Sequence, residues 1–296
     1  MRLSKTQTGE LYLYSEALLW SLFPIVTIFS YNSISPLYSA AFSTFAAALF
    51  FAVVLTAQKR WKELFVTAAW KYILALTAII GIAFYSLVFI GIQKTTAGNA
   101  GIIFLMEIFF SMVILRLWKK EFLSRYHLIG AVLMALGAFL VLFHGSLNIN
   151  QGDLIILIAT ALPPIGNYFI QEARKKVSST YIMFIRSLIS GFFMLGMAYF
   201  IETEPSVADI RTSLLFIAVN GFLLLGLSKI FWIEAIHRIP ITKAISLASI
   251  APFFTLFFAY LFLSEIPTPW QISGLIPIML GTWILTDFKT ARKAMP

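Results

Sequence analysis

Charged side chains interrupt three long apolar stretches of this sequence. Glu107, Arg186 and Lys229 each have mainly apolar neighbours on both sides. Burying a charge in hydrocarbon costs at least about 2.5 to 3.5 kcal/mol, so each of these groups needs a partner or a polar cavity. Residues of this kind mark candidate sites for a proton, an ion or a charged solute.

Glu107 lies near the centre of its apolar stretch, where hydrocarbon is driest. A carboxyl group at that depth must bind a proton or a cation, or pair with a basic side chain. We therefore expect either a coupling group that exchanges protons or cations, or a fixed structural partner of Lys229 or Arg186.

The two basic side chains each have two interpretations. Glu234 follows Lys229 by five residues, which places them on different faces of a helix, so no direct pair is expected. Lys229 is then available to bind a substrate carboxylate or to neutralise Glu107. Arg186 lies one to two turns inside its stretch, where its long side chain either reaches the lipid headgroups or serves the substrate. Glu16 is similarly shallow, and we expect a structural role for it.

Neutral polar and aromatic side chains supply further candidates. Asparagines inside apolar helices either bond neighbouring helices or line a cavity. Aromatic rings there face lipid, pack in the core or contact an apolar solute. The predicted substrate-binding or coupling residues are therefore Glu107, Lys229, Arg186, Asn220, Asn167, Trp20 and Tyr168.

Prolines interrupt three of the apolar stretches. A proline inside a helix removes one backbone hydrogen bond and bends the helix. We predict kinks at Pro24, Pro164 and Pro252, of which the first two occupy matching places in the two halves of the sequence. These kinks are either bending points of a conformational change or static features.

The residues that most enzymes and metal sites need are missing. The sequence has no Cys, which excludes disulfides, thiolate metal sites and a Cys nucleophile. Its three His residues have no second ligand at metal-binding spacing. Phosphate-binding GxxxxGK[ST], HExxH and GxSxG motifs are absent as well. We therefore expect no metal, no cofactor and no enzymatic activity.

The composition determines which elements position the candidate residues. Hydrophobic residues make up 60% of the 296 residues and charged residues only 12%, whereas soluble domains have about 25% charged residues. The predicted fold class is an all-α integral membrane protein. With about 20 apolar residues per span, ten transmembrane helices are expected at 11–30, 36–56, 72–92, 97–117, 127–143, 153–170, 181–201, 214–236, 242–263 and 271–286.

The basic residues predict the orientation of these helices. Of the 22 Lys and Arg residues, 18 lie in alternate connections and near the chain ends, on one predicted side of the membrane. The positive-inside bias assigns that side to the cytoplasm, so both termini are cytoplasmic in a multi-pass protein of the inner (plasma) membrane. On the opposite side, we expect Glu202, Glu204 and Asp209 to form a solvated acidic patch.

The sequence also repeats internally. The stretch that begins at Ile90 aligns without a gap with the stretch that begins at Glu234, and Glu121 then matches Glu265. The repeat predicts two five-helix halves, residues 1–145 and 146–296. Because five is odd, the second half enters the membrane from the opposite side, so the repeats are inverted. Inverted repeats are typical of secondary transporters.

The second half carries a recognisable pattern. Small residues open a helix, a proline and an aromatic residue follow, a Glu ends the helix, and glycines space the next one; the residues are Ala244, Pro252, Phe253, Glu265, Gly274 and Gly281. This pattern resembles the EamA-like module of the drug/metabolite transporter superfamily, and Thr96 to Gly137 is similar to a second copy. Since Ile108 stands where the proline would be, the helix at 97–117 is expected to be straighter than that at 242–263.

The resemblance implies ten helices with cytoplasmic ends, a central cavity between the halves, and transport of amino acids or other metabolites. We therefore expect a secondary transporter of a small metabolite such as an amino acid, an exporter that works by alternating access. The alternatives are a lipid or prenyl-carrier flippase and a small-molecule drug efflux protein. A polar solute requires Glu107, Lys229 and Asn220 to converge, whereas a flippase requires an apolar groove.

The expected partners are a small-molecule substrate and the lipid bilayer, with no nucleic acid. Proton coupling stays open, and so does the choice between a monomer and a homodimer.

Overall fold

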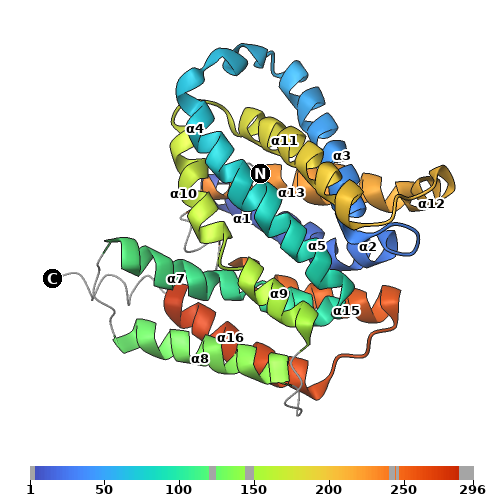
Figure 1. Cartoon of the computed structure of the whole chain (residues 1–296). Coiled ribbons are helices and arrows are strands. Elements are labelled where there is room, and N and C mark those ends of the chain that lie inside the picture. Colours follow the sequence, from blue (N-terminus) through green and yellow to red (C-terminus); the bar gives the residue numbers. More distant parts are fainter. Residues whose placement is uncertain (1–3, 120–124, 144–149, 240–243, 245–246, 287–296) are drawn as a thin grey trace.

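The computed structural model describes the whole chain except residues 1–3, 120–124, 144–149, 240–243, 245–246 and 287–296. All regular elements in the described part are helices (Figure 1). The apolar composition explains this, because a chain in lipid must satisfy its backbone polar groups internally, and helices do so within one segment.

The first half contains helices that follow one another with short connections. They are α1 (Lys5–Ser21), α2 (Phe23–Ser30), α3 (Pro36–Ala57), the 3₁₀ helix η1 (Trp61–Phe65), α4 (Thr67–Leu76), the π-helical η2 (Thr77–Phe84), α5 (Tyr85–Gln93), α6 (Ala97–Ile103), α7 (Met106–Lys119) and α8 (Arg125–Phe143).

The second half, in its described part, is also a succession of helices. Its helices are α9 (Gln151–Ala159), α10 (Pro163–Arg174), α11 (Ser179–Ile201), α12 (Val207–Ala218), the π-helical η3 (Val219–Leu227), α13 (Ser228–Ile236), α15 (Ala251–Leu263) and α16 (Pro269–Thr286).

Several of these helices join into longer apolar segments. Within the described residues, seven segments are long and apolar enough to cross a membrane. They are Lys5–Ser30, Pro36–Ala57, Thr67–Gln93, Ala97–Ile114, Gln151–Arg174, Ser179–Ile201 and Val207–Ile236. Leu128–Phe143 and Ala251–Leu263 are shorter apolar helices. The architecture is that of an integral membrane protein, and each segment falls at one of the predicted spans.

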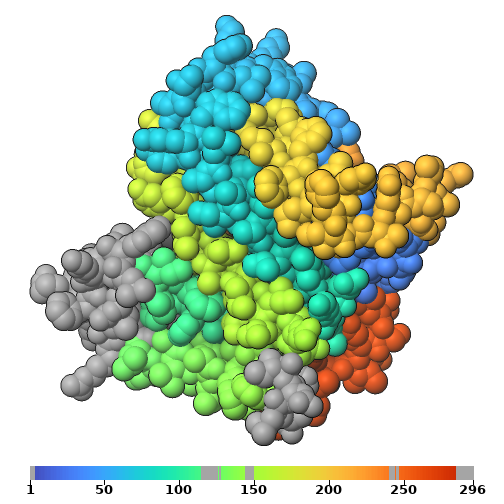
Figure 2. All heavy atoms as spheres, in the orientation of Figure 1, coloured from blue at the N-terminus to red at the C-terminus, as the bar shows by residue number. Residues whose placement is uncertain are grey.

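Helices from the two halves lie side by side throughout. α3 packs along α11, and α8 packs along α16 (Figure 1). α1 contacts α13, α2 contacts α12, α4 contacts α10, and α5 contacts α9. In the space-filling view, α11 is seated against α4 and the segment before it (Figure 2). The core therefore lies between the halves, and a site there draws on both.

The glycines of α8 and α16 allow the closest of these approaches. A β-carbon added at Gly137 would lie 2.4 Å from the carbonyl oxygen of Gly274, which is too close for any side chain. Small residues at such positions let two helix backbones meet inside a membrane. The outward faces of the same helices carry exposed apolar side chains, among them Val132 and Ile276, as expected where lipid covers them.

Prolines open the helices that follow each break. α1 ends before Leu22, and Pro24 lies in the first turn of α2. α10 starts with Pro163 and Pro164, and Pro252 lies in the first turn of α15. A first turn has no intrahelical use for the N–H that proline lacks, so the helix restarts there without a lost hydrogen bond.

The helix at 97–117 is divided, although it lacks the proline; the expected comparison with 242–263 falls partly outside the described residues. α6 ends at Ile103 and α7 begins at Met106, with i to i−3 hydrogen bonds from Leu105 and Glu107 in between. A β-carbon at Gly101 would lie 2.7 Å from Thr255. The helix turn is therefore tightened just after the point where α6 closely approaches α15.

Glu202 corrects a second expectation, because it is not part of a solvated patch. Its carboxylate is half-buried and accepts hydrogen bonds from the backbone N–H groups of Leu37 (3.0 Å) and Tyr38 (3.2 Å) at the start of α3. Glu63 likewise accepts from the N–H (2.7 Å) and hydroxyl (2.6 Å) of Ser178 before α11. Each of the paired helices α3 and α11 therefore has an anion at its N-terminus: Glu202, directly after α11, binds the start of α3, and Glu63 of η1 binds the residue before α11.

Candidate functional site

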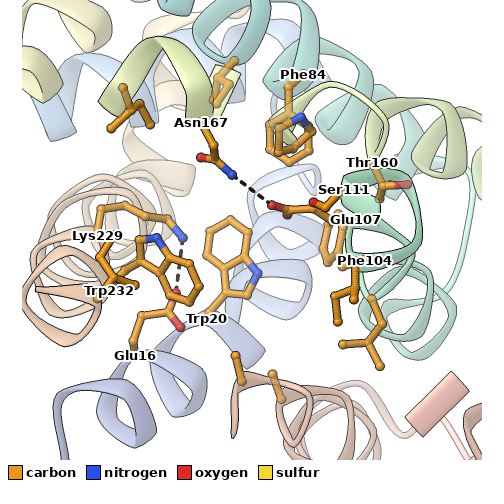
Figure 3. Close-up of a pocket in the computed structure, with 18 of the residues that line it drawn as sticks. Glu16, Trp20, Phe84, Phe104, Glu107, Ser111, Thr160, Asn167, Lys229 and Trp232 are labelled. Carbon is orange, nitrogen blue, oxygen red and sulfur yellow. Dashed lines mark hydrogen bonds and ion pairs between the residues drawn. The ribbon is translucent and has the colours of Figure 1, made fainter. Parts of the chain in front are cut away.

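A cavity of about 230 Å³ lies between the two halves. It receives side chains from α1, α7, α10, α11 and α13, among others, and its lining mixes charged, polar and aromatic groups (Figure 3). Of the predicted residues, it is lined by Trp20, Glu107, Asn167, Arg186 and Lys229. Pro24 and Pro252 line it as well.

Lys229 is neutralised on one wall of the cavity. Its ammonium lies 3.4 Å from Oε1 of Glu16 and 3.4 Å from the ring centroid of Trp20 (Figure 3). Trp20 is fixed in turn by stacking on Phe23, with ring centroids 4.6 Å apart. Glu234, as expected, does not pair with Lys229; it pairs with Arg238. α1 and α13 are thus joined by a buried ion pair with a cation–π contact.

Glu107 faces the same cavity from α7. The amide of Asn167 on α10 donates to its Oε1 over 3.4 Å (Figure 3). Among the described side chains, Glu107 forms no ion pair, either with Lys229 or with Arg186. A lone buried carboxylate with one neutral donor retains unsatisfied acceptor capacity, which suits a proton or a cationic group.

Arg186 lines the cavity from α11 and is only 4% exposed. Its Nε has no hydrogen-bond partner, and the centre of its guanidinium lies 5.5 Å from the ring centroid of Tyr85. This position contradicts the alternative in which Arg186 reaches the headgroups, because the side chain is enclosed by other helices. Within the described part of the chain it has no carboxylate partner, so a buried cation faces the cavity unpaired.

The remaining predicted residues lie elsewhere. Asn220 is fully buried, and its amide donates to the hydroxyl of Thr27 over 3.0 Å, outside the cavity lining. Tyr168 is 46% exposed and contacts the ring of Phe169. Pro164 is buried beside Pro163, which does line the cavity. Asn220 and Tyr168 face these positions because of the rotation of their helices, which spacing alone does not give.

Glu16 was expected to have only a structural role, but it lines the cavity and pairs with Lys229. It lies inside an apolar stretch, and the signal used for Glu107 applies to it equally. Trp232, one of the aromatic residues expected either to line a cavity or to pack in the core or against lipid, lines the cavity beside Lys229, although it was not among the predicted substrate-binding residues (Figure 3). Only the high aromatic content of the sequence pointed to it. The described residues contain no cluster of His, Cys, Asp or Glu that could hold a metal ion.

Comparisons with known proteins agree with this architecture. The sequence profile of the EamA-like transporter family matches residues 7–143 and 150–287. The uncharacterized transporter YoaV of Bacillus subtilis is 22% identical over 283 residues, which cover 94% of this chain and 97% of YoaV. The uncharacterized transporter YyaM of the same organism is 24% identical, with 83% of each chain covered.

Of two further similarities, one covers only part of the chain and the other shows only the fold. The pseudopaline exporter CntI of Pseudomonas aeruginosa is 28% identical over 117 residues, or 40% of this chain and 39% of CntI. One solved crystal structure superposes with a TM-score of 0.67 at 13% identity, covering 97% of this chain and 99% of the other. That structure shares the fold.

Proposed function

Because the chain belongs to the EamA-like transporter family, we propose that it is a secondary transporter that exports a small zwitterionic metabolite, such as an amino acid, by alternating access. It is a multi-pass membrane protein and not an enzyme. We propose the class of its substrate, the direction of transport and the mechanism of transport.

The observation that carries the proposal is the pattern of pairing among the charges of the cavity. Glu16 neutralises Lys229, whereas Glu107 and Arg186 form no ion pair among the described residues. Among the described residues, Glu107 and Arg186 therefore face the same space without an ion pair. A solute that carries both an ammonium and a carboxylate satisfies both groups at once and offsets their desolvation. Arg186 would bind the carboxylate, and Glu107 with Asn167 would bind the ammonium.

The size of the cavity supports a small solute. Its volume of about 230 Å³ lies below the roughly 300 to 1,000 Å³ typical of sites for drug-sized ligands. Trp20 and Trp232 add apolar surface for a side chain of the solute. Most of the lining is apolar, but the charged groups of Glu107 and Arg186 within it favour a solute with polar ends over a lipid.

The helix pairs support the proposed inverted repeat of ten spans, divided at residues 1–145 and 146–296. Exchanging the halves converts the pair α1 and α13 into α9 and α5, and the pair α2 and α12 into α10 and α4. The π-helical segments η2 and η3 also exchange places. Two equivalent halves can rock against each other around a central site, which is the basis of alternating access. With both termini in the cytoplasm, the protein would lie in the inner membrane.

The proposal is tested by transport in proteoliposomes. The purified protein is reconstituted, and labelled amino acids and other small metabolites are screened for uptake with and without a pH gradient. We expect one zwitterionic solute to be transported, and we expect Glu107→Gln to remove the effect of the gradient. Tyr168→Phe, outside the cavity, is the matched control and should behave as wild type.

Two results would count against the proposal. Transport that keeps its full gradient dependence in Glu107→Gln would make Glu107 structural. Movement of labelled lipids without movement of any soluble solute would replace the transporter by the flippase.

A further inference from the structure

A polar cluster joins the two halves at one end of the cavity. It links the start of α6 and the residues before it to the start of α9, the end of α15 and the start of α16. We call this cluster the polar latch; its side chains are those of Thr95, Thr96, Asn99, Asp153, Glu265 and Gln271.

Asn99 is the centre of the polar latch. Its amide nitrogen donates to Oδ2 of Asp153 over 2.9 Å, and its amide oxygen accepts from Nε2 of Gln271 over 2.8 Å. The hydroxyl of Thr95 donates to the other oxygen of Asp153. Asp153 is fully buried, while Asn99 and Gln271 are 8% and 6% exposed. Water therefore does not compete for these hydrogen bonds in this conformation.

Glu265 contributes hydrogen bonds to the backbone of α6 at the same end of the cavity. Its carboxylate oxygens accept from the N–H groups of Ala97 (3.2 Å) and Gly98 (3.3 Å), the first residues of α6. A carboxylate at this place also interacts favourably with the positive end of the helix dipole. The loop after α15 is thereby attached to α6.

Two glycines allow the backbones to meet there. A β-carbon at Gly152 would lie 2.6 Å from the carbonyl oxygen of Gly91, and one at Gly98 would lie 2.8 Å from Nε2 of Gln271. Close backbone approach combined with buried hydrogen bonds forms a tight seal. The cavity ends just below it, where Gly101 and Thr255 are part of the lining.

The opposite end of the cavity is open. Gln171, an exposed residue near the end of α10, belongs to the lining, and so does Arg174, the last residue of that helix. The cavity thus reaches the surface at the end of α10, while the polar latch separates it from the other side. By the distribution of basic residues, the open side is the cytoplasmic one.

Each of these hydrogen bonds joins residues 1–145 to residues 146–296. If the two halves move against each other, hydrogen bonds that close one end of the cavity must break when that end opens. A contact between the halves outside the cavity lining, such as that of Ser178 with Glu63, can persist. We propose that the polar latch is the gate that closes this end of the cavity, and that its hydrogen bonds break when the cavity opens to the outer side. The proposal rests on transport by alternating access, and it names the residues that hold one of the two states.

Cysteine accessibility tests this without knowledge of the substrate. The chain has no Cys, so Ser111→Cys places a single thiol in the cavity (Figure 3). A membrane-impermeant maleimide is applied to either face of membrane vesicles. We expect rapid labelling from the side of Gln171 and slow labelling from the latch side. Adding Asn99→Ala should raise the rate from the latch side about tenfold, because it removes the central hydrogen bonds.

Ser178→Ala is the matched control. It also removes a hydrogen bond between the halves, the one from the Ser178 hydroxyl to Glu63 (2.6 Å), but at the opposite end. It should leave labelling from the latch side unchanged. If Asn99→Ala prevents folding, so that neither side is labelled, the isosteric Thr95→Val decides, since it removes only one donor to Asp153.

The gate is overturned if a folded latch variant is labelled from the latch side at the same rate as its parent, or if the Ser178→Ala control rises equally. Because labelling needs no solute, it tests the proposed gate independently of the proposed substrate class. A working gate in a protein that transports no zwitterion would contradict only the proposed substrate.

Discussion

Arg186 and Glu107 are the residues that we propose bind the solute. Both are held in the cavity by their neighbours: Tyr85 lies beside the guanidinium, and Asn167 donates to the carboxylate. An unpaired buried charge is costly, and proteins keep such charges where a ligand completes them. We therefore expect each of the two charges to bind one ionic end of the proposed solute.

The role of Arg186 predicts a selective loss of affinity. Arg186→Met should raise the KM for the transported zwitterion by about tenfold or more, since hydrogen bonds to charged groups are worth about 1.5 to 3 kcal/mol. Arg186→Lys should recover part of this loss, because it restores the charge without the planar fork. The measurement is transport in proteoliposomes. Equal loss for an amine analogue without a carboxylate would show that Arg186 does not bind that group.

The Glu16 and Lys229 pair predicts a pattern of stability. Lys229→Met leaves Glu16 buried without a partner, and breaking a buried pair costs about 3 to 5 kcal/mol. The double variant with Glu16→Gln should recover most of the lost stability, because neither charge is then unpaired. Thermal unfolding in detergent measures both variants. A double variant as unstable as Lys229→Met alone would contradict this account.

At the scale of elements, helices from opposite halves are fastened in two ways. Inside the membrane, glycines let backbones meet, as they do between α8 and α16. At the membrane surfaces, glutamates bind the N-termini of neighbouring helices, as Glu202 binds α3 and Glu63 binds α11. The first kind of contact depends on shape and the second on charge, so different substitutions break them.

Close packing predicts different effects for two glycines. Gly137→Ala should lower the yield of folded protein and its thermal stability, because the new methyl group would lie 2.4 Å from the carbonyl oxygen of Gly274. Gly196→Ala on α11 meets nothing within 4 Å. It should be neutral or stabilise the helix by up to about 1 kcal/mol. Equal effects of the two substitutions on the unfolding temperature would disprove the packing argument.

Helix capping predicts a contrast between neighbouring glutamates. Glu202→Ala should reduce stability by about 1 kcal/mol, the usual cost of losing a helix cap, because Leu37 and Tyr38 lose their acceptor. Glu204→Ala is the control, since Glu204 is exposed. Thermal unfolding of the two variants should separate them. A decrease as large for Glu204→Ala would refute a specific role of Glu202.

At the scale of the whole molecule, the cavity lies between residues 1–145 and 146–296, and the polar latch is the proposed gate at one end. The ion pair of Glu16 and Lys229 and the hydrogen bond of Glu107 and Asn167 both connect the halves. A solute bound between them therefore contacts both moving parts. This links binding to the movement that opens or closes each side.

The proposed orientation predicts which connections face outward. Asn32 lies between α2 and α3, and Gln58 follows α3; both are exposed. In intact cells, an impermeant thiol reagent should label a single cysteine at Asn32 and leave one at Gln58 unlabelled. The reverse pattern would place the termini outside and assign the polar latch to the cytoplasmic side.

The membrane fold, the family resemblance and three of the charged residues that line the cavity could be predicted from the sequence. The charged residues follow from one physical rule: charges are too costly in hydrocarbon to be placed there without a use. The rule applies to each residue separately, so no knowledge of neighbours is needed. It identified Glu107, Arg186 and Lys229, and it also applied to Glu16.

The pairing of these charges could not be predicted without the three-dimensional structure. Lys229 finds its partner in Glu16, 213 positions away, while Glu107 and Arg186 remain unpaired among the described residues. The same holds for Asn99, whose partners Asp153 and Gln271 lie in the other half. Such pairs depend on how each helix is rotated and which helices it meets. That choice is made by packing over the whole chain, which spacing within one segment does not encode.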